Sequence, residues 1–173
     1  MQNKISTKRL VTVAAVAAIY AVLTVALAPI SYGNIQFRVS ELLVLLAFFD
    51  PFYIGGLTLG CLIANLLGPN GMMDVIFGTL ATFISLSAIS LTARFTKGNR
   101  LGLIIASLWP TLFNAVIIGW MLHYLFKLPL ALTMLQVGLG ELVVVTLVGV
   151  PVFMLIMQKY PHLLHAHKKN IAS

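Results

Sequence analysis

The sequence predicts an all-α integral membrane protein with six transmembrane helices in a single domain, residues 1–173. Composition is the first observation: 60% of the residues are hydrophobic, 9% are charged, and the mean hydropathy is +1.03. A soluble domain has about 25% charged residues, so this chain cannot cover a water-facing surface. The other two observations are long uncharged runs and basic residues that gather in alternate connections.

Six apolar runs are the candidate spans. They cover approximately residues 10–28, 38–49, 52–67, 75–94, 101–126 and 130–157. A helix needs about 20 residues to cross a hydrocarbon core, so the second run is short for a span. The first run also resembles a cleaved signal peptide, but it exceeds the usual core of about 7–15 apolar residues. We therefore expect it to stay as a transmembrane helix.

The basic residues test this number of spans. With a cytoplasmic N-terminus, the inner segments hold Lys4, Lys8, Arg9, Arg94, Lys97, Arg100, Lys159, Lys168 and Lys169, and the outer segments hold Arg38 and Lys127. This is a strong positive-inside bias. Merging the two short elements between residues 39 and 67 would move Arg94, Lys97 and Arg100 outside. The pattern predicts both termini inside, and it explains the net charge of +7 without nucleic acid.

Polar side chains interrupt the apolar runs at a few places. The densest group is the segment 32–41, which sets an amide, a guanidinium and a carboxylate between two apolar runs. Glu141 follows Pro129 by 12 positions, roughly 18 Å at 1.5 Å per residue, and ionisable residues at such depth mark functional sites. We expect a small-molecule site near the outer face. Its candidate residues are Gln36, Arg38, Glu41, Asn65, Asp74, Asn114, Trp120 and Glu141.

These residues also have purely structural explanations. Arg38 and Glu41 are three positions apart and could pair on one helix face. Asp74 could cap the N-terminus of a helix, and the two candidate asparagines could hydrogen-bond between helices. Glu141 could belong to a buried ion pair, for example with Arg38. The sequence leaves these alternatives open beside the ligand-binding hypothesis.

Groups for metal, nucleotide or catalytic chemistry are sparse. The single Cys61 excludes an internal disulfide, and His162, His165 and His167 lie in a polar tail without a carboxylate or Cys. The chain has no glycine-rich loop with the Lys-Ser/Thr ending that cradles a nucleotide. The spans hold no Ser-His-Asp or metal-ligand set. We expect no metal, no cofactor and no enzyme.

The first run carries a row of alanines, Ala14, Ala17, Ala18 and Ala21, spaced three and four apart. Small residues at this spacing let a second helix approach closely. We expect this face to contact another membrane protein.

Three blocks, residues 33–41, 55–66 and 74–82, resemble the queuosine-precursor transporter (QueT) family, which belongs to the substrate-binding S-components of energy-coupling factor (ECF) transporters. The resemblance implies a six-helix S-component in the cell membrane that captures a 7-deazaguanine outside the cell. It also implies a complex with a transmembrane coupling subunit and two ATPases. The first helix of S-components docks through an Ala-x-x-x-Ala pattern, which Ala14 with Ala18 or Ala17 with Ala21 fits.

The residues leave two other classes of function open. A self-sufficient secondary transporter or channel for a small polar solute is the main alternative, although the chain has no evident inverted repeat and few intramembrane ionisable residues. An intramembrane enzyme would need a catalytic constellation that the spans lack.

Overall fold

The computed structural model describes residues 7–33 and 35–159, which are helical apart from short connections. In chain order the elements are α1 (Thr7–Ala26), α2 (Ala28–Ser31), the 3-10 helix η1 (Val39–Leu45), α3 (Leu46–Phe49), α4 (Tyr53–Leu67), α5 (Gly71–Met73), the π-helix η2 (Asp74–Gly78), α6 (Thr79–Phe95), α7 (Arg100–Phe126), α8 (Leu130–Glu141), the π-helix η3 (Leu142–Gly149) and α9 (Val150–Lys159). No strand occurs among these residues, so the prediction of an all-helical protein is confirmed.

Four continuous stretches are long and apolar enough to cross a membrane: Thr7–Ala26, Gly71–Phe95, Arg100–Phe126 and Leu130–Lys159. They correspond to the four long runs in the sequence. Two shorter apolar stretches, Val39–Phe49 and Tyr53–Leu67, lie where the short second and third spans were expected. The protein is therefore a multi-pass membrane protein, while the count of six crossings and their orientation stay predictions.

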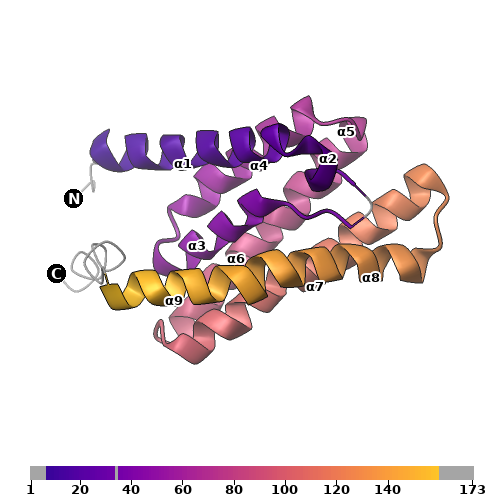
Figure 1. Ribbon diagram of the computed structural model, residues 1–173. Coiled ribbons are helices and arrows are strands. Elements are labelled where there is room, and N and C mark those ends of the chain that lie inside the picture. Colours follow the sequence, from indigo (N-terminus) through magenta and orange to yellow (C-terminus); the bar gives the residue numbers. More distant parts are fainter. Residues whose placement is uncertain (1–6, 34, 160–173) are drawn as a thin grey trace.

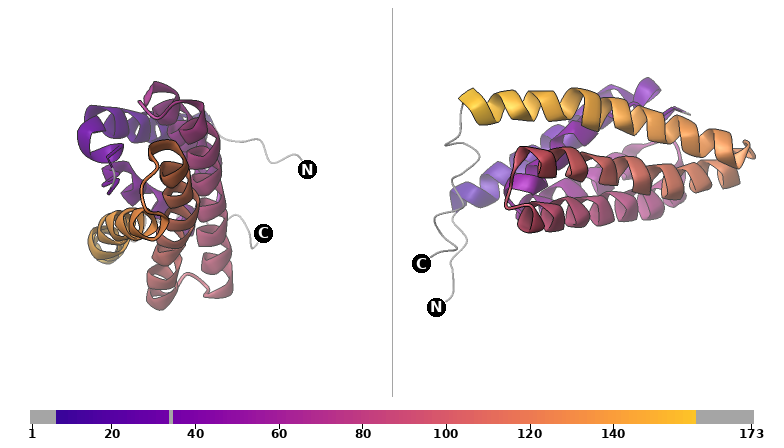
Figure 2. Two further views of the ribbon diagram at one scale, coloured as in Figure 1. Left: turned by 90° about the vertical axis from the view of Figure 1, so that its right-hand side faces the viewer. Right: turned by 90° about the horizontal axis from the view of Figure 1, so that it is seen from below.

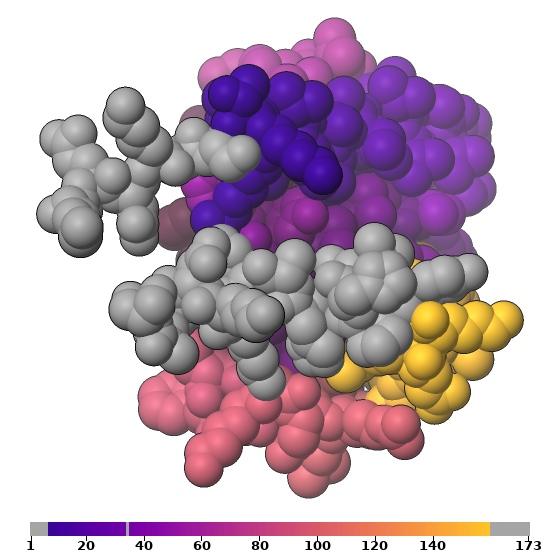
Figure 3. Space-filling view, turned by 90° about the vertical axis from the view of Figure 1, so that its left-hand side faces the viewer, coloured from indigo at the N-terminus to yellow at the C-terminus, as the bar shows by residue number. Residues whose placement is uncertain are grey.

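The helices form an elongated bundle (Figure 1). The start of α1, the connection from α6 to α7 and the end of α9 lie together at one end, as the second view also shows (Figure 2). Figure 3 looks onto this end, with α1 in indigo and the end of α9 in yellow. We call it the basic end, because its described residues include Lys8, Arg9, Arg94, Lys97, Arg100 and Lys159.

The α7 helix shows how local residue types fix a span. Asn99 caps its start, and its side-chain oxygen accepts a hydrogen bond from the Gly102 amide at 2.6 Å, as expected of an N-cap residue. The helix ends at Lys127, whose φ of 56° is left-handed. Pro129 follows, and proline is common just after a helix end. The chain then returns through α8, which packs against α7.

The short second element reaches further than its residue count suggests. Seven of its residues form the 3-10 helix η1, which rises about 2.0 Å per residue instead of 1.5 Å. The segment ends at Asp50, whose carboxylate binds the Arg9 guanidinium at 2.6 Å. Arg9 also lies 4.3 Å over the Phe52 ring. These contacts hold the turn into α4 against the start of α1.

The α4 helix packs against α1 through a stripe of small residues. A Cβ atom added at Gly60 would lie 2.6 Å from the Ala17 carbonyl oxygen, and one at Gly56 would lie 2.3 Å from the Val13 Cγ1 atom. Only glycine allows the two backbones to come this close. The close-packing face expected from the glycine spacing therefore exists, and α1 occupies it.

The alanine row of α1 divides between two surfaces. Ala17 and Ala21 are buried, and they face the interior of this chain. Ala14 and Ala18 remain exposed. The spacing of Ala17 and Ala21 thus serves packing within the chain, whereas Ala14 and Ala18 stay accessible at its surface.

Two π-helical segments interrupt the long helices beside acidic residues. The segment η2 begins at Asp74, and η3 begins directly after Glu141. Such segments are rare in proteins, and those that occur are often found at functional sites. Both π-helices border the polar residues described next.

Candidate functional site

Seven of the eight candidate residues are buried in the bundle. Their exposed fractions are 2% for Gln36, 3% for Arg38, 1% for Glu41, 0% for Asn65 and Asp74, 4% for Asn114 and 2% for Glu141. We call these seven residues the buried polar cluster. Its members come from the loop before η1 and from η1, α4, η2, α7 and α8. The fold thus gathers polar groups that are up to 105 positions apart, from 36 to 141, in the chain.

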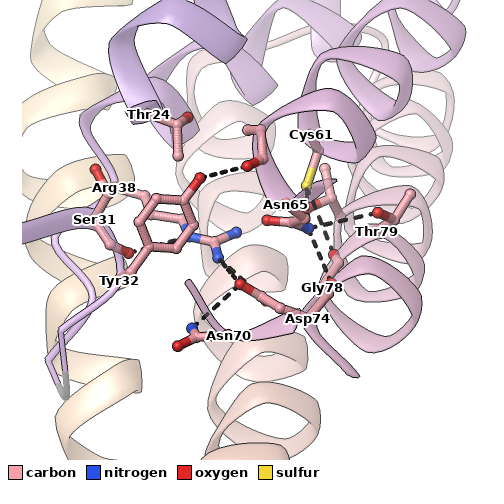
Figure 4. Close-up of polar contacts among 12 residues, drawn as sticks. Thr24, Ser31, Tyr32, Arg38, Cys61, Asn65, Asn70, Asp74, Gly78 and Thr79 are labelled. Atoms are coloured by element: carbon pink, nitrogen blue, oxygen red, sulfur yellow. Dashed lines mark hydrogen bonds and ion pairs between the residues drawn. The ribbon is translucent and has the colours of Figure 1, made fainter. Parts of the chain in front are cut away.

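Arg38 pairs with Asp74 across the bundle, as Figure 4 shows. Its Nη2 atom lies 3.0 Å from Oδ2 and 3.3 Å from Oδ1 of Asp74. Its Nε atom donates to the Ser31 carbonyl at 3.3 Å, and the guanidinium lies 5.3 Å over the Tyr32 ring. Arg38 therefore binds Asp74 rather than pairing along its own helix with Glu41.

Asp74 lies inside a continuous helical stretch that begins at Gly71. It is therefore not an N-cap residue, which was one interpretation of its position in the sequence. Its backbone carbonyl accepts a hydrogen bond from the Asn65 amide at 3.1 Å. A Cβ at Gly78 would lie 2.6 Å from Asp74 Oδ1 and 2.7 Å from Asn65 Nδ2. Gly78 therefore leaves the space that these two polar side chains fill, and Asn65 positions Asp74.

Glu41 is held by two hydroxyl groups that the sequence analysis did not select. The Tyr20 hydroxyl donates to Glu41 Oε1, and the Thr82 hydroxyl donates to the same oxygen at 3.5 Å. Beside them, Thr24 and Ser40 hydroxyls lie 2.6 Å apart. Tyr20 and Thr24 are four positions apart in the apolar second half of α1, and this spacing could have identified the face.

Glu141 lies at the end of α8, where the loop before η1 meets the helix. A Cβ at Gly140 would lie 2.1 Å from the Ile35 carbonyl oxygen and 3.0 Å from that of Gln36. Glu141 is close enough to Asn114 and Glu41 for electrostatic interaction. Gln36 adopts a left-handed φ of 51°. Glycine at position 140 thus lets the loop carrying Gln36 rest directly on the helix that carries Glu141.

Four side-chain atoms in the cluster have no hydrogen-bond partner within the described part of the chain: Gln36 Nε2, Glu41 Oε2, Asn65 Oδ1 and Glu141 Oε2. Leaving a buried polar group unsatisfied costs about 1–3 kcal/mol, and native structures rarely keep such groups. The four atoms comprise two carboxylate acceptors, one amide oxygen that accepts and one amide nitrogen that donates. They suit a polar molecule that donates to both acids and accepts from the amide.

Trp120 lies apart from the buried polar cluster. It is 41% exposed, and its ring packs edge-on against Phe77 at 5.4 Å and stacks on Tyr124 at 5.9 Å. The Nζ atom of Lys127 in turn lies over the Tyr124 ring, 4.9 Å from its centroid. This placement suits the aromatic belt of a membrane interface. Phe37 is half-buried and lies between Gln36 and Arg38 in the sequence.

No group of three or more metal-binding side chains occurs among the described residues. The tail histidines, His162, His165 and His167, lie outside those residues.

Long apolar helices that enclose an ionisable polar cluster define a multi-pass membrane protein of the kind that handles polar solutes. The sequence model described as QueT transporter matches residues 10–158. The chain therefore belongs to the QueT transporter family.

A relative from Lactococcus lactis subsp. cremoris (strain MG1363), named queuosine precursor transporter QueT, is 47% identical over 98 residues. That alignment covers 55% of this chain and 57% of the relative, so it spans little more than half of either protein. No solved structure matches the chain.

Proposed function

We propose that this protein is the substrate-binding membrane subunit of an ATP-driven ECF uptake transporter. It captures a queuosine precursor of the 7-deazaguanine type from outside the cell. The observation that carries the proposal is the set of unpartnered buried atoms in the cluster, among them those on Gln36, Glu41 and Glu141. Family membership and the name of the Lactococcus relative support the same class of substrate.

The chemistry of a guanine-like base matches these atoms. One edge of the base has two adjacent N–H donors, and a carbonyl oxygen lies beside them. A carboxylate accepts two such donors at once, and charge-assisted contacts are stronger than neutral ones. Glu141 receives this edge because, of the candidate acids, it lies deepest within its apolar run. The Gln36 amide donates to the carbonyl. Phe37 supplies the flat apolar wall.

The other members of the cluster hold this arrangement in place. Asn114 interacts with Glu141 and fixes the direction of its carboxylate. The Arg38–Asp74 pair joins the loop before η1 to the π-helix η2. A ligand bound between them is enclosed, because all seven residues of the cluster are buried.

The charge distribution supports an orientation with both termini in the cytoplasm. The described basic residues at the basic end would then face inward, in accordance with the positive-inside rule. The opposite end, where α7 turns into α8 (Figure 1), would face outward. The loop that carries Gln36 and the turn that carries Asn70 lie toward this outer end, which provides the entry for the ligand.

The partners are a transmembrane coupling subunit and two ATPases. An apolar groove of about 430 Å³ lies between α1 and α4. Its lining includes Leu10, Ala14, Pro51, Phe52 and Leu59. Ala14 and the exposed Ala18 form the remaining Ala-x-x-x-Ala face, which supports docking of a partner helix at this surface.

Calorimetric titration of 7-aminomethyl-7-deazaguanine into the purified protein tests the site. The wild type binds, whereas Glu141→Gln presents a donor to the N–H groups of the base. The unpaired groups cost about 1–3 kcal/mol or more, so affinity falls at least roughly tenfold. Lys127→Asn is the control, since Lys127 is exposed and asparagine tolerates its left-handed backbone. Wild-type affinity in Glu141→Gln would remove Glu141 from the site.

A further inference from the structure

We propose that the connection between α6 and α7 binds an anionic phospholipid at the membrane surface. We call this connection, residues 94–101, the basic turn. It presents three exposed basic side chains, Arg94, Lys97 and Arg100, and two exposed apolar ones, Phe95 and Leu101. Lipid binding at this surface is separate from ligand capture in the buried polar cluster, and it does not depend on which end of the bundle faces the cytoplasm.

The three cations of the basic turn have no acidic side chain as an ion-pair partner within the described part of the chain. The protein has four acidic side chains in all. Glu41, Asp74 and Glu141 are buried in the bundle, and Asp50 binds Arg9 at 2.6 Å. Three exposed positive charges between positions 94 and 100 repel one another at short range. An external anion at the basic turn offsets this repulsion.

Phe95 places an aromatic ring among these charges. Its exposed fraction is 84%, the highest among the large hydrophobic side chains that the structure describes, and Leu101 is 64% exposed. Surfaces that combine Phe or Leu with Lys and Arg bind anionic membranes, because the apolar groups enter the boundary between headgroups and acyl chains. The same combination favours a phospholipid over a free phosphate ion, which contacts the cations alone.

Local contacts fix the shape of the basic turn. The Gly98 amide donates to the Ala93 carbonyl at 2.9 Å, and Lys97 and Gly98 have left-handed φ values of 53° and 67°. A Cβ atom at Gly102 would lie 2.0 Å from the Thr96 hydroxyl oxygen. The start of α7 is thus held directly against the end of α6, which keeps the three cations in one compact patch.

The basic turn lies away from the surface proposed for the partner helix. Figures 1 and 3 place α1 and the basic turn on opposite sides of the basic end. The apolar groove between α1 and α4 contains no residue of the basic turn. The turn joins two stretches long enough to cross a membrane, Gly71–Phe95 and Arg100–Phe126, so it lies at the level of the lipid headgroups. Charge and depth therefore favour lipid as its occupant.

A lipid titration of the unaltered chain in detergent tests the proposal, with native mass spectrometry as the readout. Phosphatidylglycerol is compared with phosphatidylcholine of identical acyl chains. Each basic residue near a membrane surface strengthens the attraction to anionic lipid roughly fivefold. We expect phosphatidylglycerol to bind at least roughly tenfold more tightly. The preference should disappear at about 1 M salt, where the screening length is about 3 Å. Equal binding of the two lipids at low salt would overturn the proposal.

Two double variants with the same loss of charge locate the site. Arg94→Gln with Arg100→Gln should weaken phosphatidylglycerol binding at least roughly tenfold and leave phosphatidylcholine binding within about twofold. Lys8→Gln with Lys159→Gln removes two exposed charges from the same end of the bundle. Because salt screens separated surface charges, this control should lower phosphatidylglycerol affinity by no more than about threefold. Equal losses in the two double variants would show a diffuse attraction and overturn a site at the basic turn.

Phe95→Ser measures the apolar contribution. It should weaken both lipids by a similar factor, at least roughly threefold, and keep their ratio. Unchanged affinities for both lipids would contradict a role for the ring.

Two further outcomes would assign the basic turn to another occupant. Displacement of phosphatidylglycerol by inorganic phosphate at constant ionic strength would show a site for a free anion. Loss of copurifying partner proteins in the arginine double variant, with lipid binding unchanged, would show a protein interface. We expect neither result.

Discussion

Arg38 and Asp74 show at the scale of single residues why this membrane protein keeps charge in its interior. The pair joins two elements that are 36 positions apart, and each partner has further hydrogen bonds. Removing one member of a buried pair leaves an uncompensated charge in the interior. The free-energy cost of that charge exceeds the net stabilisation that the intact pair provides. The pair therefore constrains the fold around the ligand site.

Asp74→Asn should destabilise the protein strongly, by about 3–5 kcal/mol, because Arg38 loses its carboxylate partner and stays buried. The thermal unfolding midpoint in detergent measures this loss. Asn70→Ala is the matched control, since it removes only a neutral 3.3 Å contact to the same carboxylate and should cost about 0.5–1.5 kcal/mol. Equal midpoints for both variants would contradict a structural role for the ion pair.

The burial of the polar residues could be predicted from the sequence, but their hydrogen-bond and ion-pair partners could not. Depth in a span follows from counting residues, so Glu141 and Asn114 were identified. Partners depend on how helices rotate against each other, so the Arg38–Asp74 pair and the Tyr20 hydroxyl at Glu41 were missed. Trp120 was selected as a candidate aromatic side chain for a flat ligand, and its residue type does not reveal that the side chain lies on the exposed face.

At the scale of elements, close contacts at glycines determine the geometry of the site. The loop before η1 lies on α8 at Gly140, the position before Glu141. The four long spans could be predicted from apolar length and turn residues. The π-helices could not be predicted, since a single wider turn has no residue pattern of its own. The helical stretch that contains η2 begins at Gly71 rather than at the expected residue 75.

Gly140→Ala should impair ligand binding more than it impairs folding. The added Cβ would lie 2.1 Å from a backbone oxygen, so the loop with Gln36 must move away from Glu141. We expect an affinity loss of at least roughly tenfold, as one misplaced hydrogen bond would produce. Gly138→Ala on the same helix is the control, because its Cβ would meet only the Ala115 side chain at 3.2 Å. Unchanged affinity in Gly140→Ala would show that the loop does not position the site.

At the scale of the whole molecule, α1 connects two surfaces. Its inner face carries Tyr20, which binds Glu41, and Ala17, which packs on α4. Its outer face carries Ala14 and Ala18, which are exposed beside an apolar groove. One helix thus contacts both the candidate ligand site and the proposed docking surface.

Replacing Ala14 and Ala18 together with Leu should abolish copurification of the coupling subunit and ATPases, because bulky side chains prevent close helix approach. Ligand binding should be retained, since both residues face away from the buried polar cluster. Val22→Leu on the same exposed side of α1 is the control and should leave the complex intact. Copurification at wild-type levels in the double variant would exclude this surface as the docking site.

Replacing Ala17 and Ala21 should have a different effect, since they pack within the chain. Overpacking a close interface costs about 1–3 kcal/mol, so the loss would appear in the unfolding midpoint.

Native mass spectrometry of the purified protein with 7-aminomethyl-7-deazaguanine tests the central claim most directly, because it counts the molecules bound to the chain in the absence of partners. We predict one bound ligand per wild-type chain and its loss in Glu141→Gln at the same concentration. A wild-type chain that retains no ligand, or a Glu141→Gln chain that retains as much as the wild type, would contradict the assignment of the buried polar cluster as the binding site.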